Sequence, residues 1–163
     1  AVPTGIFGEH DHFHPQEGSM LASLIQRFHE NREGNDPIVV WGDGTPMRQY
    51  TYAPDLARAY MWMLDHYDDP QILNVGSSEE HSVRDIAHMI ADALEIDRGR
   101  IAFDESKPSG ASRRNTDVSR FQKLSGIVFT PFREALSQTV RWYVDTAANT
   151  PDILRTQSKI RVP

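Results

Sequence analysis

The spacing of apolar residues changes repeatedly along this chain, and this alternation constrains its fold more than any other feature. Short apolar or alternating runs, typical of strands, occupy residues 1–6, 38–41, 48–52, 71–75 and 101–103. Between them lie segments in which apolar residues recur every three or four positions, as on one face of a helix. These segments cover residues 20–32, 54–67, 82–94, 117–124 and 131–146. Strands that alternate with helices predict an α/β fold, and strands so few and short predict a small sheet with flanking helices.

Turn and cap residues support these boundaries. The Gly-Asn-Asp-Pro cluster at 34–37 ends the first helical segment, and the Gly-Asp-Gly sequence at 42–44 predicts a tight turn after a strand. Pro54 suits the first position of a helix, where its missing N–H costs nothing. Ser82 and Asp85 have the spacing of a capping box in which the usual Glu is shortened to Asp.

Composition narrows the class of protein. The 163 residues suffice for one domain, and 39% hydrophobic with 25% charged residues is typical of a globular protein. No apolar run approaches the roughly 20 residues that span a bilayer. The chain has no cysteine, so it contains no disulfide or thiolate metal site, which fits a reducing compartment. The net charge of -6 argues against a general nucleic-acid binder. We therefore expect a cytoplasmic protein with neither nucleic acid nor membrane as a partner.

Four sequence blocks carry a resemblance to a known family. They are Pro3-Thr-Gly-Ile-Phe-Gly-Glu-His-Asp-His-Phe-His-Pro15, Leu24-Ile-Gln-Arg-Phe-His-Glu30, Val40-Trp-Gly-Asp-Gly-Thr-Pro-Met-Arg-Gln-Tyr50, and Ser106-Lys-Pro-Ser-Gly110 with Thr116-Asp-Val-Ser-Arg120. The third block is the most specific. Through these blocks the chain resembles the GDP-L-fucose synthase family, which are extended short-chain dehydrogenases of the NAD-dependent epimerase/dehydratase type. That family epimerises GDP-4-keto-6-deoxymannose at two carbons and reduces its ketone with NADPH.

The resemblance implies how the chain is organised. The family's front half holds the NADP-binding sheet and a catalytic Tyr and Lys, and its back half caps the sugar-nucleotide pocket. Neither Gly-x-Gly-x-x-Gly nor Tyr-x-x-x-Lys occurs here. We therefore expect residues 1–147 to be the C-terminal, substrate-binding half, with 1–8 the end of the cofactor-domain sheet and 148–163 a polar tail. Alone it should be inactive, should meet NADP only through an N-terminal half, and should form a homodimer or pair with that half.

The resemblance also assigns site residues. Those expected near the cofactor are Pro3, Thr4, Gly5 and Ile6. Those expected to contact the GDP-sugar are Arg27, Trp41, Arg48 and Arg114. A guanidinium fork suits a diphosphate, and a rigid aromatic side chain suits a sugar-nucleotide pocket. Taken without the resemblance, each arginine is more readily explained as solvated surface charge, and Trp41 as a core residue.

Three positions depart from the family pattern. Ser19 stands where the family has its acid-base histidine, Gly5 where it has Asn, and Ser109 where it has Asp. A serine hydroxyl cannot exchange protons near neutral pH as an imidazole can, and such catalysis is typically worth ~10²–10⁴-fold in rate. His12 or His14 could compensate by reaching in from the loop.

Histidines 10, 12 and 14 suggest a metal site by composition alone. Their spacing of two in a loop fixes no common face, and no set of carboxylates converges on them, so we expect no metal. Two alternatives to an epimerase-reductase half remain open. One is a divergent nucleotide-sugar reductase or dehydratase without epimerase activity, and the other is a non-catalytic interaction module.

Overall fold

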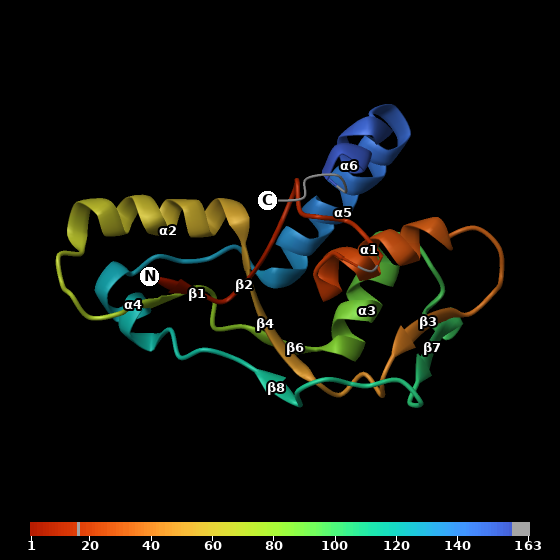
Figure 1. Cartoon of the computed structure of the whole chain (residues 1–163), viewed down its shortest axis with the longest axis horizontal. Helices are drawn as coiled ribbons and strands as arrows, with labels where there is room; N and C mark the ends of the chain where they lie inside the picture. The colour runs from red at the N-terminus through yellow and green to blue at the C-terminus, as the bar shows by residue number, and fades with distance from the viewer. Residues whose placement is uncertain (16, 158–163) are drawn as a thin grey trace.

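The computed structural model describes residues 1–15 and 17–157 (Figure 1). The helices are α1 (Met20–Glu30), α2 (Ala53–His66), α3 (Val83–Ala93), α4 (Ser119–Ser125), α5 (Phe132–Asn149) and α6 (Pro151–Gln157), with a 3-10 turn η1 at Arg98–Arg100. The strands are β1 (Val2–Pro3), β2 (Gly5–Phe7), β3 (Ile38–Trp41), β4 (Met47–Tyr52), β5 (Asn74–Val75), β6 (Glu80–Ser82), β7 (Ile101–Asp104) and β8 (Arg113–Arg114). No helix in this described part is long and apolar enough to cross a membrane.

The strands form three small sheets rather than one. β1 pairs in parallel with β5, and β3 pairs in parallel with β7. The third sheet is built on β4, which pairs in parallel with β2 and β8 and antiparallel with β6. β4 therefore joins the first residues of the chain to a segment more than a hundred residues later. The predicted α/β class, with small sheets and flanking helices, is confirmed.

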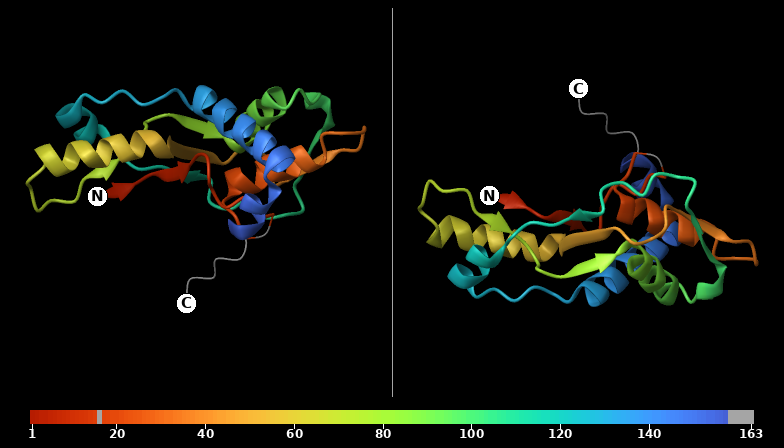
Figure 2. Two further views of the ribbon diagram at one scale, coloured as in Figure 1. Left: turned by 90° about the horizontal axis from the view of Figure 1, so that it is seen from above. Right: turned by 90° about the horizontal axis from the view of Figure 1, so that it is seen from below.

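Two hydrophobic clusters occupy opposite ends of an elongated molecule (Figure 2). The larger lies among α1, α3 and α5, where the apolar faces of the three helices meet. Its most deeply buried members include Leu21, Ile25, Phe28, Ile86, Ile90, Leu136 and Val140. The smaller is formed by Leu56, Ala59, Leu73, Val75 and Phe121, between α2 and α4. The helical periodicities seen in the sequence are therefore explained by burial at these two places.

The predicted capping box is present at the start of α3. The Ser82 hydroxyl accepts a hydrogen bond from the Asp85 N–H at 3.0 Å, and the Asp85 carboxylate accepts one from the Ser82 N–H at 3.3 Å. This satisfies two backbone donors that a helix leaves without a partner at its first turn. The Ser82 hydroxyl also donates a 2.6 Å hydrogen bond to the Asp85 carboxylate, which lowers the pKa of Asp85.

Three segments differ from the sequence expectations. Only Asn74–Val75 of the expected 71–75 strand pairs with a neighbour, and Arg113–Arg114 forms a strand inside the expected 107–115 loop. The described part of the expected tail is mostly helical: α5 continues to Asn149, and α6 begins at Pro151, after the capping residue Thr150. Leu154 packs on the larger cluster, which accounts for α6. Residues 158–163 of the expected tail lie outside the described residues.

Asp92 connects three elements, and its ionisation predicts a pH-dependent stability. Arg98 donates two hydrogen bonds of 2.7 Å to its carboxylate and Arg133 donates one of 3.1 Å. The bonds from Arg98, with a smaller contribution from Arg133, lower the pKa of Asp92 to about 2. A lowered pKa means that this stabilisation is present above about pH 4 and is lost as the pH falls toward 2.

Replacing Asp92 with Asn is therefore expected to lower the free energy of unfolding by about 1 kcal/mol at pH 7, a value reduced for solvent screening because the side chain is 34% exposed. Urea unfolding at several pH values measures the effect, with Asp145→Asn on the exposed face of α5 as the control. The Asp92→Asn difference should shrink below about pH 4. A difference that stays constant down to pH 3 would contradict the assignment.

Candidate functional site

Two hollows lie side by side on the molecule and share part of their lining. The first, of about 610 Å³, is formed by the start of β2, the N-terminus of α1, β4 and β8. The second, of about 630 Å³, lies between α1, β3 and the 106–110 loop. Met20 and Arg48 line both. An elongated ligand could therefore occupy both hollows at once, and Arg48 would be at its middle.

Arg48 and Arg114 are brought together by strand pairing. β8 lies beside β4 in the register that pairs these two residues, so their side chains share one face of the sheet. Both line the first hollow. The Nη1 of Arg48 donates to the carbonyl oxygens of Met47 and Ala111, at 2.8 and 2.9 Å, which holds its guanidinium in place. Two adjacent positive charges repel each other, and a bound anion would relieve that repulsion.

The neighbouring Arg113 has a different role. It donates two hydrogen bonds, of 2.8 and 2.7 Å, to the Glu80 carboxylate on β6 and so lowers the pKa of Glu80. Because successive residues of a strand point to opposite faces, Arg113 is directed away from the face that holds Arg114. Only the structure distinguishes the two arginines of this pair.

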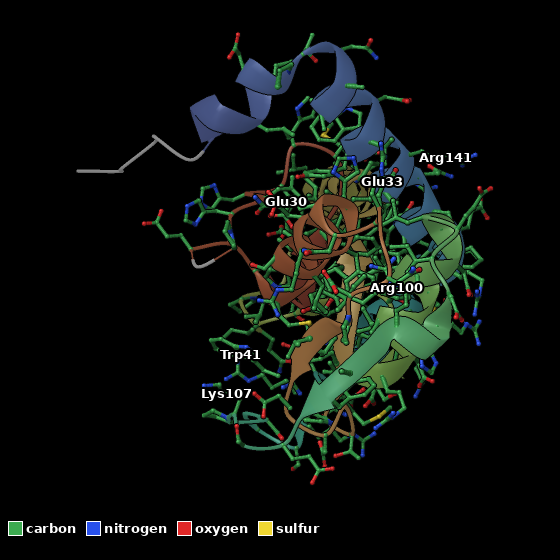
Figure 3. All side chains as sticks on the ribbon, turned by 90° about the vertical axis from the view of Figure 1, so that its right-hand side faces the viewer. Glu30, Glu33, Trp41, Arg100, Lys107 and Arg141 are labelled. Atoms are coloured by element: carbon green, nitrogen blue, oxygen red, sulfur yellow. The ribbon has the colours of Figure 1, made fainter. Side chains whose placement is uncertain are left out.

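Arg27 and Trp41 meet at the second hollow. Arg27 on α1 donates a 2.8 Å hydrogen bond to the Val39 carbonyl oxygen, and its guanidinium carbon lies 5.9 Å from the centre of the Trp41 ring. Along β3, Ile38 and Val40 are buried whereas Val39 and Trp41 are exposed. Trp41 is 58% exposed, so it is not a core residue. In Figure 3, Trp41 and Lys107 project toward the same side of the molecule.

The Gly-Asp-Gly turn allows the 106–110 loop to close on the second hollow. A side chain at Gly42, whose φ is +83°, would meet the Ser109 Oγ at 2.6 Å and its Cα at 2.9 Å. Ser109 donates a 3.4 Å hydrogen bond to Asp43. Glycine is required here both for the backbone angle and for the close approach. Ser109, one of the three departures from the family, therefore lies at the wall of the second hollow.

Of the four residues expected near the cofactor, Pro3, Thr4 and Gly5 line the first hollow. Ile6 is not among its lining residues and is 44% exposed. A Cβ on Gly5 would lie 2.8 Å from the Tyr50 Cδ1, so the ring of Tyr50 fills the space that the family's Asn would need. The departure at Gly5 is thus matched by the packing of Tyr50 beside it.

Sequence reasoning missed Gln49, which shapes the floor of the first hollow. Its side-chain amide donates to the carbonyl oxygens of Ser77 and Thr116, at 2.8 and 3.1 Å, and accepts from the Thr116 N–H at 2.6 Å. Gln49 is 6% exposed, and a buried amide with three partners fixes the backbone around it. The alternation in residues 48–52 was the available signal, since it placed Gln49 on the opposite face from Arg48.

Ser19, at the family's histidine position, lies at the rim of the first hollow and caps α1. Its hydroxyl accepts from the Ala22 N–H at 3.3 Å and donates to the Asp11 carboxylate at 3.4 Å. Burial raises the pKa of Asp11. Because Asp11 accepts the hydrogen bond from Ser19, it is a titratable group next to that hydroxyl, and the sequence did not indicate it. His12 and His14 are not lining residues of either hollow.

Comparison with known proteins finds similarity along most of the chain. The model of the NAD dependent epimerase/dehydratase family matches residues 1–76. The chain is 36% identical over 146 residues to a probable GDP-L-fucose synthase 1 of Oryza sativa subsp. japonica, a match covering 89% of the chain and 44% of that protein. It is 34% identical to GDP-L-fucose synthase 1 of Arabidopsis thaliana, with 91% and 46% covered.

The same likeness appears in three dimensions. The crystal structure of a GDP-L-fucose synthetase from Naegleria fowleri bound to NADP superposes with a TM-score of 0.85 at 30% identity, covering 91% of this chain and 47% of that one. The chain spans about half the length of these relatives. The sequence blocks, the fold and the similarity thus agree: residues 1–76 match the NAD dependent epimerase/dehydratase family, and most of the chain is similar to about half of a GDP-L-fucose synthase.

Proposed function

We propose that this chain is the sugar-nucleotide-binding half of an enzyme that epimerises and reduces a GDP-4-keto-6-deoxy sugar with NADPH. The observation that carries the proposal is the pairing of Arg48, which lines both hollows, with Arg114, which lines the first. A guanidinium pair of this kind suits a diphosphate, which needs several charge-assisted donors. The choice of a GDP-linked sugar is supported by the names of the relatives, which are GDP-L-fucose synthases.

The shape of the site suggests how the ligand is oriented. The base and ribose would lie in the second hollow, where the exposed Trp41 ring offers a stacking surface beside Arg27. The diphosphate would lie at Arg48 and Arg114. The sugar would then extend into the first hollow, toward Gly5 and Ser19. In this arrangement the chain's own residues bind and orient the substrate and exclude water from it.

The residues present fit only part of an NADP site. Pro3, Thr4 and Gly5 border the first hollow, so they could contact the nicotinamide end. The chain has neither the Gly-rich phosphate turn nor the Tyr and Lys of the family, and these would come from a cofactor half. NADPH would supply the hydride for the reduction. Within the described residues β1 has β5 as its one strand neighbour, and its Val2 is 44% exposed, so a further strand could add there.

Calorimetric titration of the chain with GDP tests the proposal. We expect saturable binding that weakens with salt, and binding of guanosine weaker by roughly tenfold or more because guanosine lacks the diphosphate. Equal affinity for GDP and guanosine, or no GDP binding by the folded chain, would overturn the assignment of the arginines. Tight NADPH binding by this chain alone would instead contradict the proposal that the cofactor site lies in another half.

The position of Ser19 favours a second candidate, a reductase without epimerase activity. Its hydroxyl is engaged in capping α1 and in bonding to Asp11, and it cannot act as an imidazole would at neutral pH. The chain assembled with a cofactor half would then reduce the ketone without exchanging the adjacent protons. Solvent deuterium in the reduced product at the epimerised carbons would count against this candidate.

A further inference from the structure

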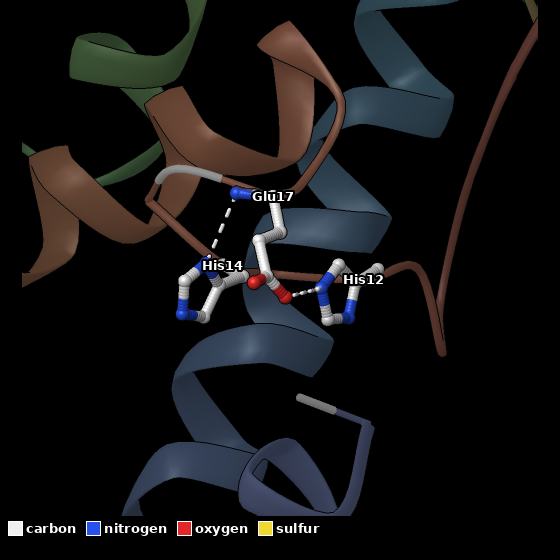
Figure 4. Close-up of side chains that lie close together, drawn as sticks. All are labelled: His12, His14 and Glu17. Carbon is white, nitrogen blue, oxygen red and sulfur yellow. Dashed lines mark hydrogen bonds and ion pairs between the residues drawn. The ribbon is translucent and has the colours of Figure 1, made fainter. Parts of the chain in front are cut away.

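We propose that His12, His14 and Glu17 bind one divalent transition-metal ion, best matched by Zn²⁺. Each of the three offers a ligand atom, and these atoms lie within 4.8 Å of one another (Figure 4). The two imidazole rings stack with their centres 5.7 Å apart and their planes 11° apart. The Glu17 carboxylate lies 3.9 Å from the His12 Nε2. The site is separate from both hollows and does not depend on the proposed function.

A buried phenylalanine gives the two histidines a common face. Phe13, between them in the chain, is 6% exposed and packs against Tyr143 with ring centres 4.7 Å apart. Because Phe13 points into the core, the residues on either side of it point outward together. The sequence argument that a spacing of two fixes no common face is therefore wrong for His12 and His14.

Hydrogen bonds also hold the backbone of the described residues next to the cluster. The His14 N–H donates to the His12 carbonyl oxygen at 3.0 Å, and the His14 carbonyl oxygen accepts from the Gly18 N–H at 3.0 Å and the Ser23 hydroxyl at 2.8 Å. A Cβ at Gly18 would lie 2.3 Å from the His12 carbonyl oxygen, so only glycine permits this closure. The loop therefore presents its side chains on a backbone anchored to α1.

The three ligands match the chemistry of zinc. Two imidazole nitrogens and one carboxylate oxygen are ligands that Zn²⁺, an ion of intermediate hardness, commonly binds. Mg²⁺ and Ca²⁺ prefer oxygen ligands alone. Two ligand atoms on a tetrahedral zinc, each about 2.1 Å from the ion, are about 3.4 Å apart. Ligand atoms as much as 4.8 Å apart would have to approach by up to about 1.4 Å, and the Glu17 side chain, 65% exposed, has room to rotate. Water would complete the coordination.

Metal binding would break one hydrogen bond of the loop and would require both imidazoles to be neutral. The His14 Nδ1 accepts a 3.0 Å hydrogen bond from the Glu17 N–H, and a metal on that nitrogen would replace this bond. Both imidazoles must also be deprotonated to bind, so the affinity should fall on acidification. Pro15 and Gly18 of the same loop line the second hollow, so a bound ion would fix one wall of it.

The experiment is a calorimetric titration of the tag-free, chelator-treated chain with ZnCl₂, and separately with MgCl₂. We expect one equivalent of zinc and no magnesium. His12→Asn and His14→Asn should each weaken zinc binding at least about tenfold, the smallest loss typical even of an outer-shell partner. The control is His66→Asn, on α2, whose ring stacks on Trp62 far along the chain from the cluster; it should bind zinc like the parent.

Circular dichroism and thermal melts in EDTA show whether each variant is folded before zinc is added. If a histidine variant does not fold, the exposed Glu17→Gln variant takes its place, and it too should lose affinity. At the same zinc concentration, the rise in melting temperature should be clearly smaller for the cluster variants than for the parent and His66→Asn. Absent zinc binding by the parent overturns the proposal, as does zinc binding that survives all three cluster substitutions.

Discussion

Replacing Arg48 with alanine is expected to weaken GDP binding by roughly 10–100-fold, because hydrogen bonds to charged groups are each worth about 1.5–3 kcal/mol. Arg48 lines both hollows and its guanidinium is held by the Met47 and Ala111 carbonyl oxygens, so it is oriented before the ligand arrives. Loss of the side chain would also leave Arg114 as a single cation. Calorimetric titration with GDP at two salt concentrations measures the change in affinity and in its salt dependence.

Two further variants make this result specific. Arg48→Lys keeps the charge but not the planar fork, so it should recover only part of the affinity. Arg133→Ala removes an arginine of α5 that bonds to Asp92, outside both hollows, and should leave GDP binding unchanged. If Arg48→Ala and Arg133→Ala bind GDP equally well, the diphosphate is not at the junction of the hollows.

Truncating Phe28 to alanine is expected to lower the free energy of unfolding by about 3–5 kcal/mol, the usual cost of removing a fully buried aromatic ring. Phe28 is 0% exposed and lies in the cluster shared by α1, α3 and α5. A loss of this size is a large fraction of the 5–15 kcal/mol typical of a domain. Urea unfolding of the parent and the variant measures it.

The control for Phe28→Ala is Val128→Ala, at a side chain that is 82% exposed, and its effect should be within about 0.5 kcal/mol. Because Phe28 follows Arg27 on α1, the variant should also weaken GDP binding if it folds, by loosening the helix that carries Arg27. A loss below about 1 kcal/mol for Phe28→Ala would mean that α1 is not anchored by this cluster.

The sequence predicted the types of most elements because each is encoded by nearby residues. The capping box at Ser82 and the helical stripe that ends in Phe28 need no distant partner to be recognised. What could not be predicted depends on pairing between distant segments. That β8 would form, and would pair Arg48 with Arg114, involves residues more than sixty positions apart.

The candidate site shows the same limit. The four residues that the resemblance assigned to the substrate do lie around two adjoining hollows, and their contact with a ligand stays a prediction. The exposure of Trp41 follows from which face of β3 meets α1, and the shared face of His12 and His14 follows from the burial of Phe13. Gln49 and Asp11 lie within the family blocks but were assigned no role, because their roles come from hydrogen bonds across the fold.

Both residues of strand β8 are arginines, so an arginine would face the first hollow even if β8 shifted by one residue along β4. Strands this short specify their register weakly, and a slip of one residue turns every side chain to the opposite face. Such a slip would direct Arg113 toward the hollow and Arg114 toward Glu80. Either register leaves one arginine beside Arg48 and one available to the carboxylate on β6. A deletion or insertion in the preceding loop could therefore be tolerated without loss of the cation at the site.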